Sequence, residues 1–180
     1  PRLILLLHLV NIFTELLLSC FKKYFMSIQA GQKAPDFSLY SSDRSKVSLS
    51  DFKGKNVLVL FFPLAFTSVC TAELCAVRDD IGRYKNADAE VLAISVDSTA
   101  TLNKFKELEG YNFTLLSDFN KEVSRAYGSI YETWFSEMKG VSKRSAFVID
   151  KEGIVRYAEV LEDAGQVPDF EAINRSLASL

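Results

Sequence analysis

The chain has 180 residues, of which 48% are hydrophobic and 24% are charged. This composition suits one compact domain with a sizeable core. The formal net charge is −2 with both signs interspersed, and no basic block suggests a nucleic acid as partner. Three cysteines and one histidine are too few and too scattered for a tetrahedral zinc site. Free thiols without a disulfide framework suit a reducing, cytoplasmic compartment.

Residues 1–25 differ in composition from the rest of the chain. Residues 3–21 are largely apolar and have about the length of a membrane span, but Glu15 in their middle is costly in a bilayer. No small-residue cleavage site follows, which disfavours a signal peptide. We expect an apolar extension that either is not native, with Met26 as the true start, or anchors the protein to a membrane. The functional domain is expected over residues 26–180.

The predicted domain opens with a short strand around residues 47–49 and a turn over residues 51–55. Residues 56–62 then form an apolar, β-branched and aromatic run, which is typical of a strand buried on both faces. Pro63 ends this strand, and Thr67 or Ser68 can cap the helix that follows. Apolar residues at spacings of three and four give that helix one buried face: Leu74, Val77, Ile81 and Tyr84.

The rest of the chain alternates between strands and helices. Patterns of apolar residues predict strands over residues 90–96, 113–116, 144–150 and 154–160, and helices over residues 99–109, 121–127 and 168–177. This alternation predicts an α/β fold with a central sheet covered by helices on both faces. Residues 129–143 are predicted to be a loop, whose aromatic side chains either seal an edge of the core or face a substrate: Tyr131, Trp134 and Phe135.

Cys70 occupies the position where this fold class places its chemistry. It lies in the first turn of the predicted helix, just beyond the carboxyl end of the central strand. Unpaired N–H groups and the helix dipole at that position favour a thiolate. Ionisation alone raises reactivity at most about thirty-fold, so nearby groups must also hold the substrate. Thr67 and the N–H groups of the loop are candidates, whereas an inert buried cysteine is the alternative.

The residues around Cys70 resemble the peroxiredoxin family. The pattern Pro63-x-x-x-Thr67-x-x-Cys70 looks like the peroxidatic motif of these enzymes. The flanking Phe-Phe-Pro-Leu-Ala-Phe-Thr resembles the E-type alkyl hydroperoxide reductases, and Cys70-Thr71-x-Glu73-x-Cys75 is closer to the Q-type, or bacterioferritin-comigratory, branch. The resemblance covers nearly all of residues 27–180. It implies a thioredoxin-like fold with a central mixed β-sheet, and a thiol-dependent peroxidase that needs no metal or organic cofactor.

The resemblance also implies roles for residues of this chain. Arg144, at the start of a predicted strand, matches the arginine that sits beside the peroxidatic sulfur, although a solvated strand end is the alternative. Thr67 would bind the peroxide, Pro63 would shield the sulfur, and Glu73 would orient the arginine. The implied partners are a hydroperoxide and a thioredoxin-like reductant. E-type relatives tend to be dimers and Q-type relatives are often monomers, so a monomer or a homodimer is expected.

Cys75 is the candidate for the second, resolving thiol. It would condense with the sulfenic acid of Cys70 to form a disulfide. Five residues along an ideal helix separate the two Cα atoms by roughly 8.7 Å, and a disulfide needs about 7 Å or less. The helix must therefore unwind locally if Cys75 resolves. The alternative is a core cysteine with an external resolving thiol.

Two other functions are alternatives to the peroxidase. A thiol–disulfide oxidoreductase on the same fold usually carries C-x-x-C, whereas four residues separate Cys70 and Cys75 here. A non-catalytic redox sensor tethered to a membrane would require the apolar extension to be a real anchor.

Overall fold

The computed structural model describes residues 27–180 of the chain. Nine strands are present in this part: β1 (Ser38–Ser41), β2 (Lys46–Ser48), β3 (Asn56–Phe61), β4 (Ala89–Ser95), β5 (Thr114–Ser117), β6 (Ile130–Tyr131), β7 (Val141–Ser142), β8 (Ser145–Ile149) and β9 (Val155–Val160). The α-helices are α2 (Ser68–Asp79), α3 (Ile81–Asn86), α4 (Thr99–Glu109), α5 (Glu122–Ala126) and α6 (Phe170–Ala178). Two short 3-10 turns are η1 (Leu49–Phe52) and η2 (Phe135–Glu137).

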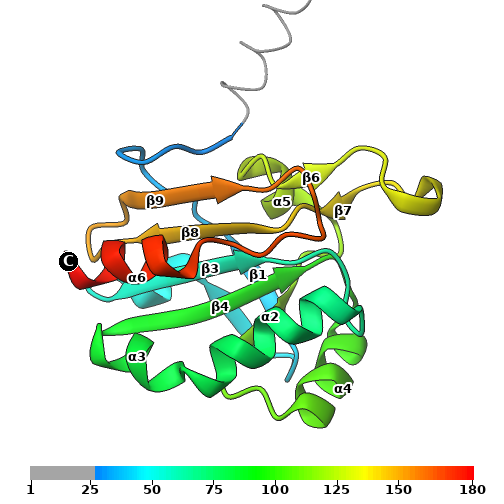
Figure 1. The fold of residues 1–180 in the computed structure, drawn as a ribbon, viewed down its shortest axis with the longest axis horizontal. Coiled ribbons are helices and arrows are strands. Elements are labelled where there is room, and N and C mark those ends of the chain that lie inside the picture. The colour runs from blue at the N-terminus through cyan, green and yellow to red at the C-terminus, as the bar shows by residue number, and fades with distance from the viewer. Residues whose placement is uncertain (1–26) are drawn as a thin grey trace, which may run out of the picture.

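Seven of these strands form a mixed sheet in the order β2-β1-β5-β4-β3-β8-β9 (Figure 1). β3 pairs in parallel with β4 and antiparallel with β8, which places it inside the sheet. All six of its residues are buried. The predicted central strand is therefore confirmed, and its double-sided burial explains its continuous apolar sequence.

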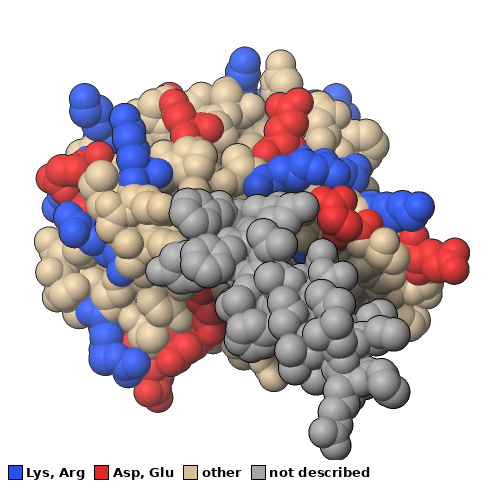
Figure 2. Space-filling view, turned by 90° about the horizontal axis from the view of Figure 1, so that it is seen from above, with Lys and Arg blue, Asp and Glu red and all other residues tan. Residues whose placement is uncertain are grey.

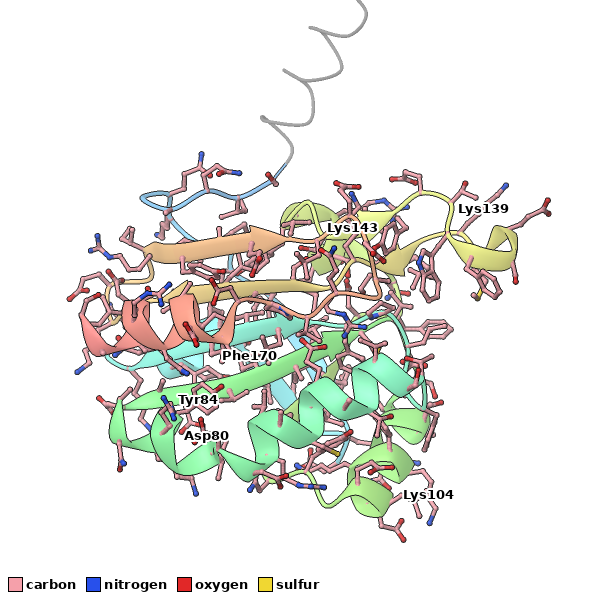
Figure 3. All side chains as sticks on the ribbon, in the orientation of Figure 1. Asp80, Tyr84, Lys104, Lys139, Lys143 and Phe170 are labelled. Carbon is pink, nitrogen blue, oxygen red and sulfur yellow. The ribbon has the colours of Figure 1, made fainter. Side chains whose placement is uncertain are left out.

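Two hydrophobic clusters lie on the two faces of the sheet. On one face, Leu58 and Leu60 of β3 pack with side chains from α2, α3, α4 and α6. On the other, Val57 and Val59 pack with side chains from α5 and the segment before β1. Tyr84 of α3 and Phe170 of α6 both reach toward the first cluster (Figure 3). Helices thus cover both faces, as the alternation of elements predicted.

The periodic apolar face after Cys70 belongs to two helices rather than one. Asp80 has φ −102° and ψ 17°, which ends α2 and begins α3. Gly82, two residues later, has a low helix propensity, and the Arg83 side chain pairs with Asp80 at 2.6 Å. Leu74, Val77 and Tyr84 are nevertheless buried on the same face of the sheet. The spacing predicted burial correctly, because the apolar side chains of α2 and α3 face the same core despite the break between the helices.

The other predicted elements are present, with boundaries shifted by one or two residues. Ser98 caps α4 by accepting the Thr101 N–H at 3.1 Å, and Gly110 closes that helix at a φ of 66°. The segment 129–143 is more regular than predicted, because β6 and β7 pair as a small second sheet around η2.

No helix in residues 27–180 is long and apolar enough to cross a membrane. The predicted apolar extension, residues 1–25, lies outside the described residues. On the face that Figure 2 shows, positive and negative side chains are interspersed rather than gathered by sign.

Candidate active site

Cys70 lies in the first turn of α2, directly beyond the carboxyl end of β3. The connection between the two elements is fixed by the Asp97 carboxylate, which accepts the Ala65 N–H at 2.8 Å. Phe66 in the same connection has a φ of 62°, a left-handed conformation that is uncommon for a bulky residue. The Cys70 side chain is only 1% exposed. A short, tightly held turn therefore sets the sulfur at the end of the central strand.

Arg144 directly precedes β8, the strand that pairs with β3. Its Nη2 donates to Sγ of Cys70 at 3.4 Å and to the carbonyl oxygen of Ala164 at 2.9 Å. Its Nε donates to the same carbonyl at 3.3 Å. The arginine side chain is 1% exposed, so it is not a solvated strand end. It supplies a fixed, charge-assisted hydrogen bond to a Cys70 thiolate.

Glu73 follows Cys70 by one turn of α2 and contacts the same arginine. Nη1 of Arg144 donates to Oε2 of Glu73 inside the protein, while Oε1 of Glu73 is buried without a hydrogen-bond partner. Burial raises the pKa of Glu73 to about 7, and the charge of Arg144 acts in the opposite direction. The pair holds the guanidinium beside Cys70, and burial allows Glu73 to bind a proton near neutral pH.

Thr67 is the N-cap residue of α2, but its side chain does not cap the helix. Its hydroxyl instead donates to the carbonyl oxygen of Leu64 at 2.9 Å. The hydroxyl proton is therefore already used in this hydrogen bond, and the oxygen lone pairs can accept a hydrogen bond from a ligand. Without a side-chain cap, N–H groups of the first turn remain available as donors. Pro63, at the other end of the same connection, is buried.

Cys75 lies farther along α2 and is a half-buried free thiol, whereas Cys70 is a buried one. α2 is continuous through both residues. Sγ of Cys75 lies 3.7 Å from Oε2 of Glu109, the last residue of α4. The two thiols thus have different partners, Arg144 for Cys70 and Glu109 for Cys75.

Some groups of the site were not found from the sequence. The Ala164 carbonyl holds Arg144 from the segment between β9 and α6, and a backbone carbonyl leaves no trace in residue type. Asp97, directly after the strand predicted over residues 90–96, was not predicted to belong to the site. The signal that could have identified Asp97 is its position, since a polar residue directly after a buried parallel strand lies at the edge of the sheet that carries the site.

The aromatic residues of the segment 129–143 differ in burial. Tyr131 is buried, stacks on Trp134 with ring centroids 5.9 Å apart, and donates its hydroxyl to the Glu162 carbonyl at 3.0 Å. It therefore seals an edge of the core. Phe135 is 75% exposed.

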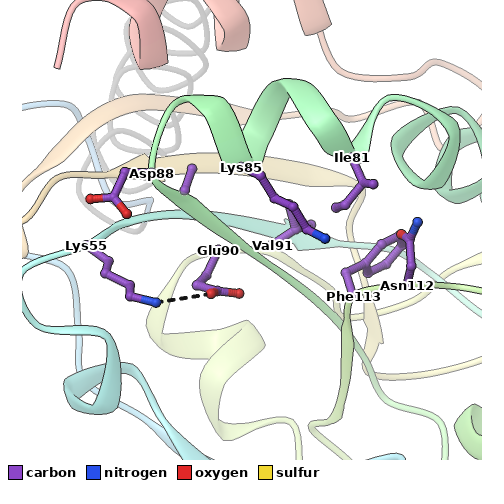
Figure 4. Close-up of a pocket in the computed structure, with 9 residues that line it drawn as sticks. Lys55, Ile81, Lys85, Asp88, Glu90, Val91, Asn112 and Phe113 are labelled. Carbon is purple, nitrogen blue, oxygen red and sulfur yellow. Dashed lines mark hydrogen bonds and ion pairs between the residues drawn. The ribbon is translucent and has the colours of Figure 1, made fainter.

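A separate pocket lies at the amino end of β4 (Figure 4). Lys55 and Glu90 form an ion pair of 3.4 Å beside it. Since β3 and β4 are parallel, this pocket is at the opposite end of the sheet from Cys70 and is not part of the site. Among the residues that the structure describes, no group of three or more His, Cys, Asp and Glu side chains could hold a metal ion.

The structure presents a buried cysteine in the first helical turn after a central strand, hydrogen-bonded to a buried arginine, which is the contact that the resemblance to peroxiredoxins implies. Comparison with known proteins agrees. The chain belongs to the AhpC/TSA family, which it matches over residues 30–158. It is therefore a peroxiredoxin, an antioxidant oxidoreductase that uses a thiol to reduce peroxides.

Individual relatives place the chain within this family. It is 40% identical over 156 residues to alkyl hydroperoxide reductase E of Mycobacterium tuberculosis, covering 85% of this chain and 98% of that protein. It is also 40% identical over 132 residues to peroxiredoxin Bcp of Escherichia coli, covering 72% of this chain and 84% of that protein. The crystal structure of peroxidoxin BcpB from M. tuberculosis superposes with a TM-score of 0.75 at 26% identity, over 85% of this chain and 98% of that one. The expected position between the two branches is confirmed.

Proposed function

We propose that Cys70 is the peroxidatic cysteine, that Cys75 resolves its sulfenic acid, and that a thioredoxin-like protein reduces the resulting disulfide. The observation that carries the proposal is the hydrogen bond of 3.4 Å from Arg144 to Cys70 in the first turn of α2. The substrates are hydrogen peroxide and organic hydroperoxides. The cytoplasm is the proposed location, because both thiols of the domain are free.

In the first step, the Cys70 thiolate attacks one peroxide oxygen and the O–O bond breaks. The sulfur keeps that oxygen as a sulfenic acid, and the other oxygen leaves as alkoxide or hydroxide and takes up a proton. Thr67 accepts a hydrogen bond from the bound peroxide, and Arg144 with the first-turn N–H groups stabilises the charge on the leaving oxygen. Pro63 shields the sulfur from water and from further oxidation. Glu73 keeps the guanidinium in place.

In the second step, the Cys75 sulfur attacks the Cys70 sulfenic sulfur, forming the disulfide and releasing water. The spacing along an intact α2 is too long for this bond, so the first turns of the helix open. Losing a few helical hydrogen bonds costs roughly 1 kcal/mol each, which local fluctuations can supply. The thioredoxin-like donor then reduces the disulfide by thiol–disulfide exchange. The working unit is a monomer or a homodimer.

The proposal is tested by peroxide consumption with a thioredoxin system and the variants Cys70→Ser and Cys75→Ser. Serine is nearly isosteric, so both variants should fold like the wild type by circular dichroism. We expect Cys70→Ser to lose turnover almost completely, because the hydroxyl is not ionised at neutral pH. Cys75→Ser should still reduce one equivalent of peroxide but should not turn over with thioredoxin. Turnover above a few percent in Cys70→Ser would refute the assignment of the peroxidatic thiol.

A further inference from the structure

A second group of polar side chains surrounds Cys75, away from the Cys70–Arg144 pair. Oε2 of Glu109 lies 3.7 Å from Sγ of Cys75, within reach of the thiol proton. The Arg78 guanidinium, one turn farther along α2, donates to the backbone carbonyl of Glu109. On its outer side Arg78 pairs with Asp79 at 2.8 Å. The charged groups that face Cys75 are therefore Arg78 from its own helix and Glu109 from the end of α4.

Tyr111, in the connection from α4 to β5, completes this group. It is 3% exposed, and its hydroxyl is buried without a hydrogen-bond partner among the described residues. Burial raises the pKa of Tyr111, and its interactions with the neighbouring Cys75 side chain and with the charge of Glu109 raise it further. The phenol therefore stays protonated and has a free donor within electrostatic reach of Cys75. A buried donor without an acceptor is costly, and a thiolate at Cys75 would provide one.

The two ends of α2 are held differently. Around Cys75, the Arg78 contact to Glu109 is joined by the Asn112 side-chain amide, which donates to the Arg78 carbonyl at 3.2 Å. The first turn, which carries Cys70, lacks a side-chain cap, and a missing cap costs a helix about 1 kcal/mol. When the first turn of α2 opens, the contacts of Arg78 and Asn112 can hold the turn around Cys75 in place. Cys75 would keep its contact with Glu109 while Cys70 approaches.

We propose that Glu109 accepts the proton of the Cys75 thiol as the disulfide forms, and that the Tyr111 hydroxyl donates a hydrogen bond to the sulfur as it becomes negative. This rests on the proposed role of Cys75 as the resolving thiol. As the Cys75 sulfur attacks the Cys70 sulfenic sulfur, its proton passes to the Glu109 carboxylate. The S–O bond of the sulfenic acid breaks, and the departing hydroxide takes a proton to leave as water. A sulfenic sulfur and a thiol sulfur are thereby joined with loss of water, and no further oxidant is needed because the peroxide has already oxidised Cys70.

The test measures disulfide formation in the full chain. Reduced protein is mixed with one equivalent of hydrogen peroxide, quenched with acid at short times, and the Cys70 sulfenic acid and the Cys70–Cys75 disulfide are quantified by mass spectrometry. The variant Glu109→Gln keeps the shape and a hydrogen-bond acceptor but takes up a proton far less readily. The matched control is Glu107→Gln, because Glu107 is on the same helix and pairs only with Lys104 in an exposed ion pair.

We expect Glu109→Gln to form the disulfide about ten-fold more slowly at neutral pH. The difference from wild type should close as the pH rises, because hydroxide then removes the thiol proton. Sulfenic acid formation at Cys70 should be unchanged, and Glu107→Gln should match wild type throughout. A wild-type rate of disulfide formation in Glu109→Gln at every pH would overturn the inference and leave the proposed function intact.

A second variant separates a role in catalysis from a role in folding. Tyr111→Phe removes only the unpartnered hydroxyl, so urea unfolding should show no loss of stability. Disulfide formation should nevertheless slow several-fold. An unchanged rate would overturn the role of Tyr111. If wild-type protein itself accumulates sulfenic acid without any disulfide, Cys75 is not the resolving thiol, and both this inference and the second step of the proposed function fail.

Discussion

The Arg144 guanidinium donates hydrogen bonds to three acceptors of different charge. The Ala164 carbonyl and the Glu73 carboxylate are structural partners of the arginine, and the Cys70 sulfur is the atom proposed to react. Removing one partner from a buried ion pair commonly costs about 3 to 5 kcal/mol, because the other charge stays buried. The contacts with Ala164 and Glu73 therefore hold the guanidinium beside the Cys70 sulfur. The cation is in place before the peroxide arrives and needs no reorganisation during the reaction.

Arg144→Lys tests whether this geometry matters beyond the charge. A lysine supplies one point of positive charge and cannot hold Glu73, Ala164 and Cys70 in one plane. We expect the second-order rate constant for oxidation of Cys70 by hydrogen peroxide to fall on the order of 100-fold. Stopped-flow measurement of the fluorescence of the single tryptophan, checked by acid quench and mass spectrometry, gives this rate. A near-normal rate would show that the guanidinium is not part of the chemistry.

At the residue scale, the sequence predicted the contact between Cys70 and Arg144 better than the groups that hold it in place. Cys70 was identified from its place after a strand and from the resemblance to peroxiredoxins, whereas Arg144 was identified from that resemblance alone. Their direct contact confirms that the arginine is not a solvated strand end. Glu109 carried no such signal, because it ends an amphipathic helix that also carries the acidic residue Glu107. Only the fold, which brings the end of α4 against Cys75, distinguishes it from Glu107.

α2 carries both cysteines, and its properties as an element determine how they can meet. The prediction of a single longer helix was wrong, because a helical period shows which side chains are buried and not where the backbone breaks. The break at Asp80 has a consequence for function. It limits the helix to Ser68–Asp79, so opening its first turns involves a large share of its length. A short helix with an uncapped start is easier to remodel than a long one.

We therefore expect an oxidised form in which the start of α2 is remodelled. Amide hydrogen exchange should show faster exchange over residues 68–74 in the disulfide form than in the reduced form, whereas β3 and β4 should remain protected. The variant Cys75→Ser, treated with the same peroxide, is the matched control, because its Cys70 can be oxidised but cannot form the internal bond. Equal protection of α2 before and after disulfide formation would contradict the geometric argument.

For the whole molecule, the fold was largely predictable and the pairing of its strands was not. Alternating strands and helices, with a doubly buried central strand, indicated the mixed sheet with helices on both faces. The order of the strands depends on contacts between distant segments, such as β1 beside β5 and β8 beside β3. A single sequence carries no direct signal for these pairs. The hydrophobic clusters on the two faces of β3 pack these distant segments together.

Because Glu73 lies inside this core, its ionisation is expected to change the stability of the whole domain. Its pKa is raised from 4.5 to about 7 in the folded protein. A raised pKa means that the folded state binds a proton that the unfolded chain has already lost. The stabilising contribution is therefore fully present below pH 4.5 and is lost as the pH rises through about 7. The shift corresponds to a change on the order of 3 kcal/mol in the free energy of unfolding across this window.

Urea unfolding of Cys70→Ser at pH values from 4.5 to 8 measures this effect without any titration of the Cys70 thiol. We expect the free energy of unfolding to fall across the window, and to fall much less when Glu73→Gln is added. The amide does not ionise, so the double variant retains the contributions of all other groups. The lowered pKa values of Asp43 and Asp150 do not produce the same trend, since those carboxylates lose their stabilising effect only at more acidic pH. Parallel pH profiles for the two variants would show that Glu73 stays ionised beside Arg144, and that the ion pair outweighs the cost of burial.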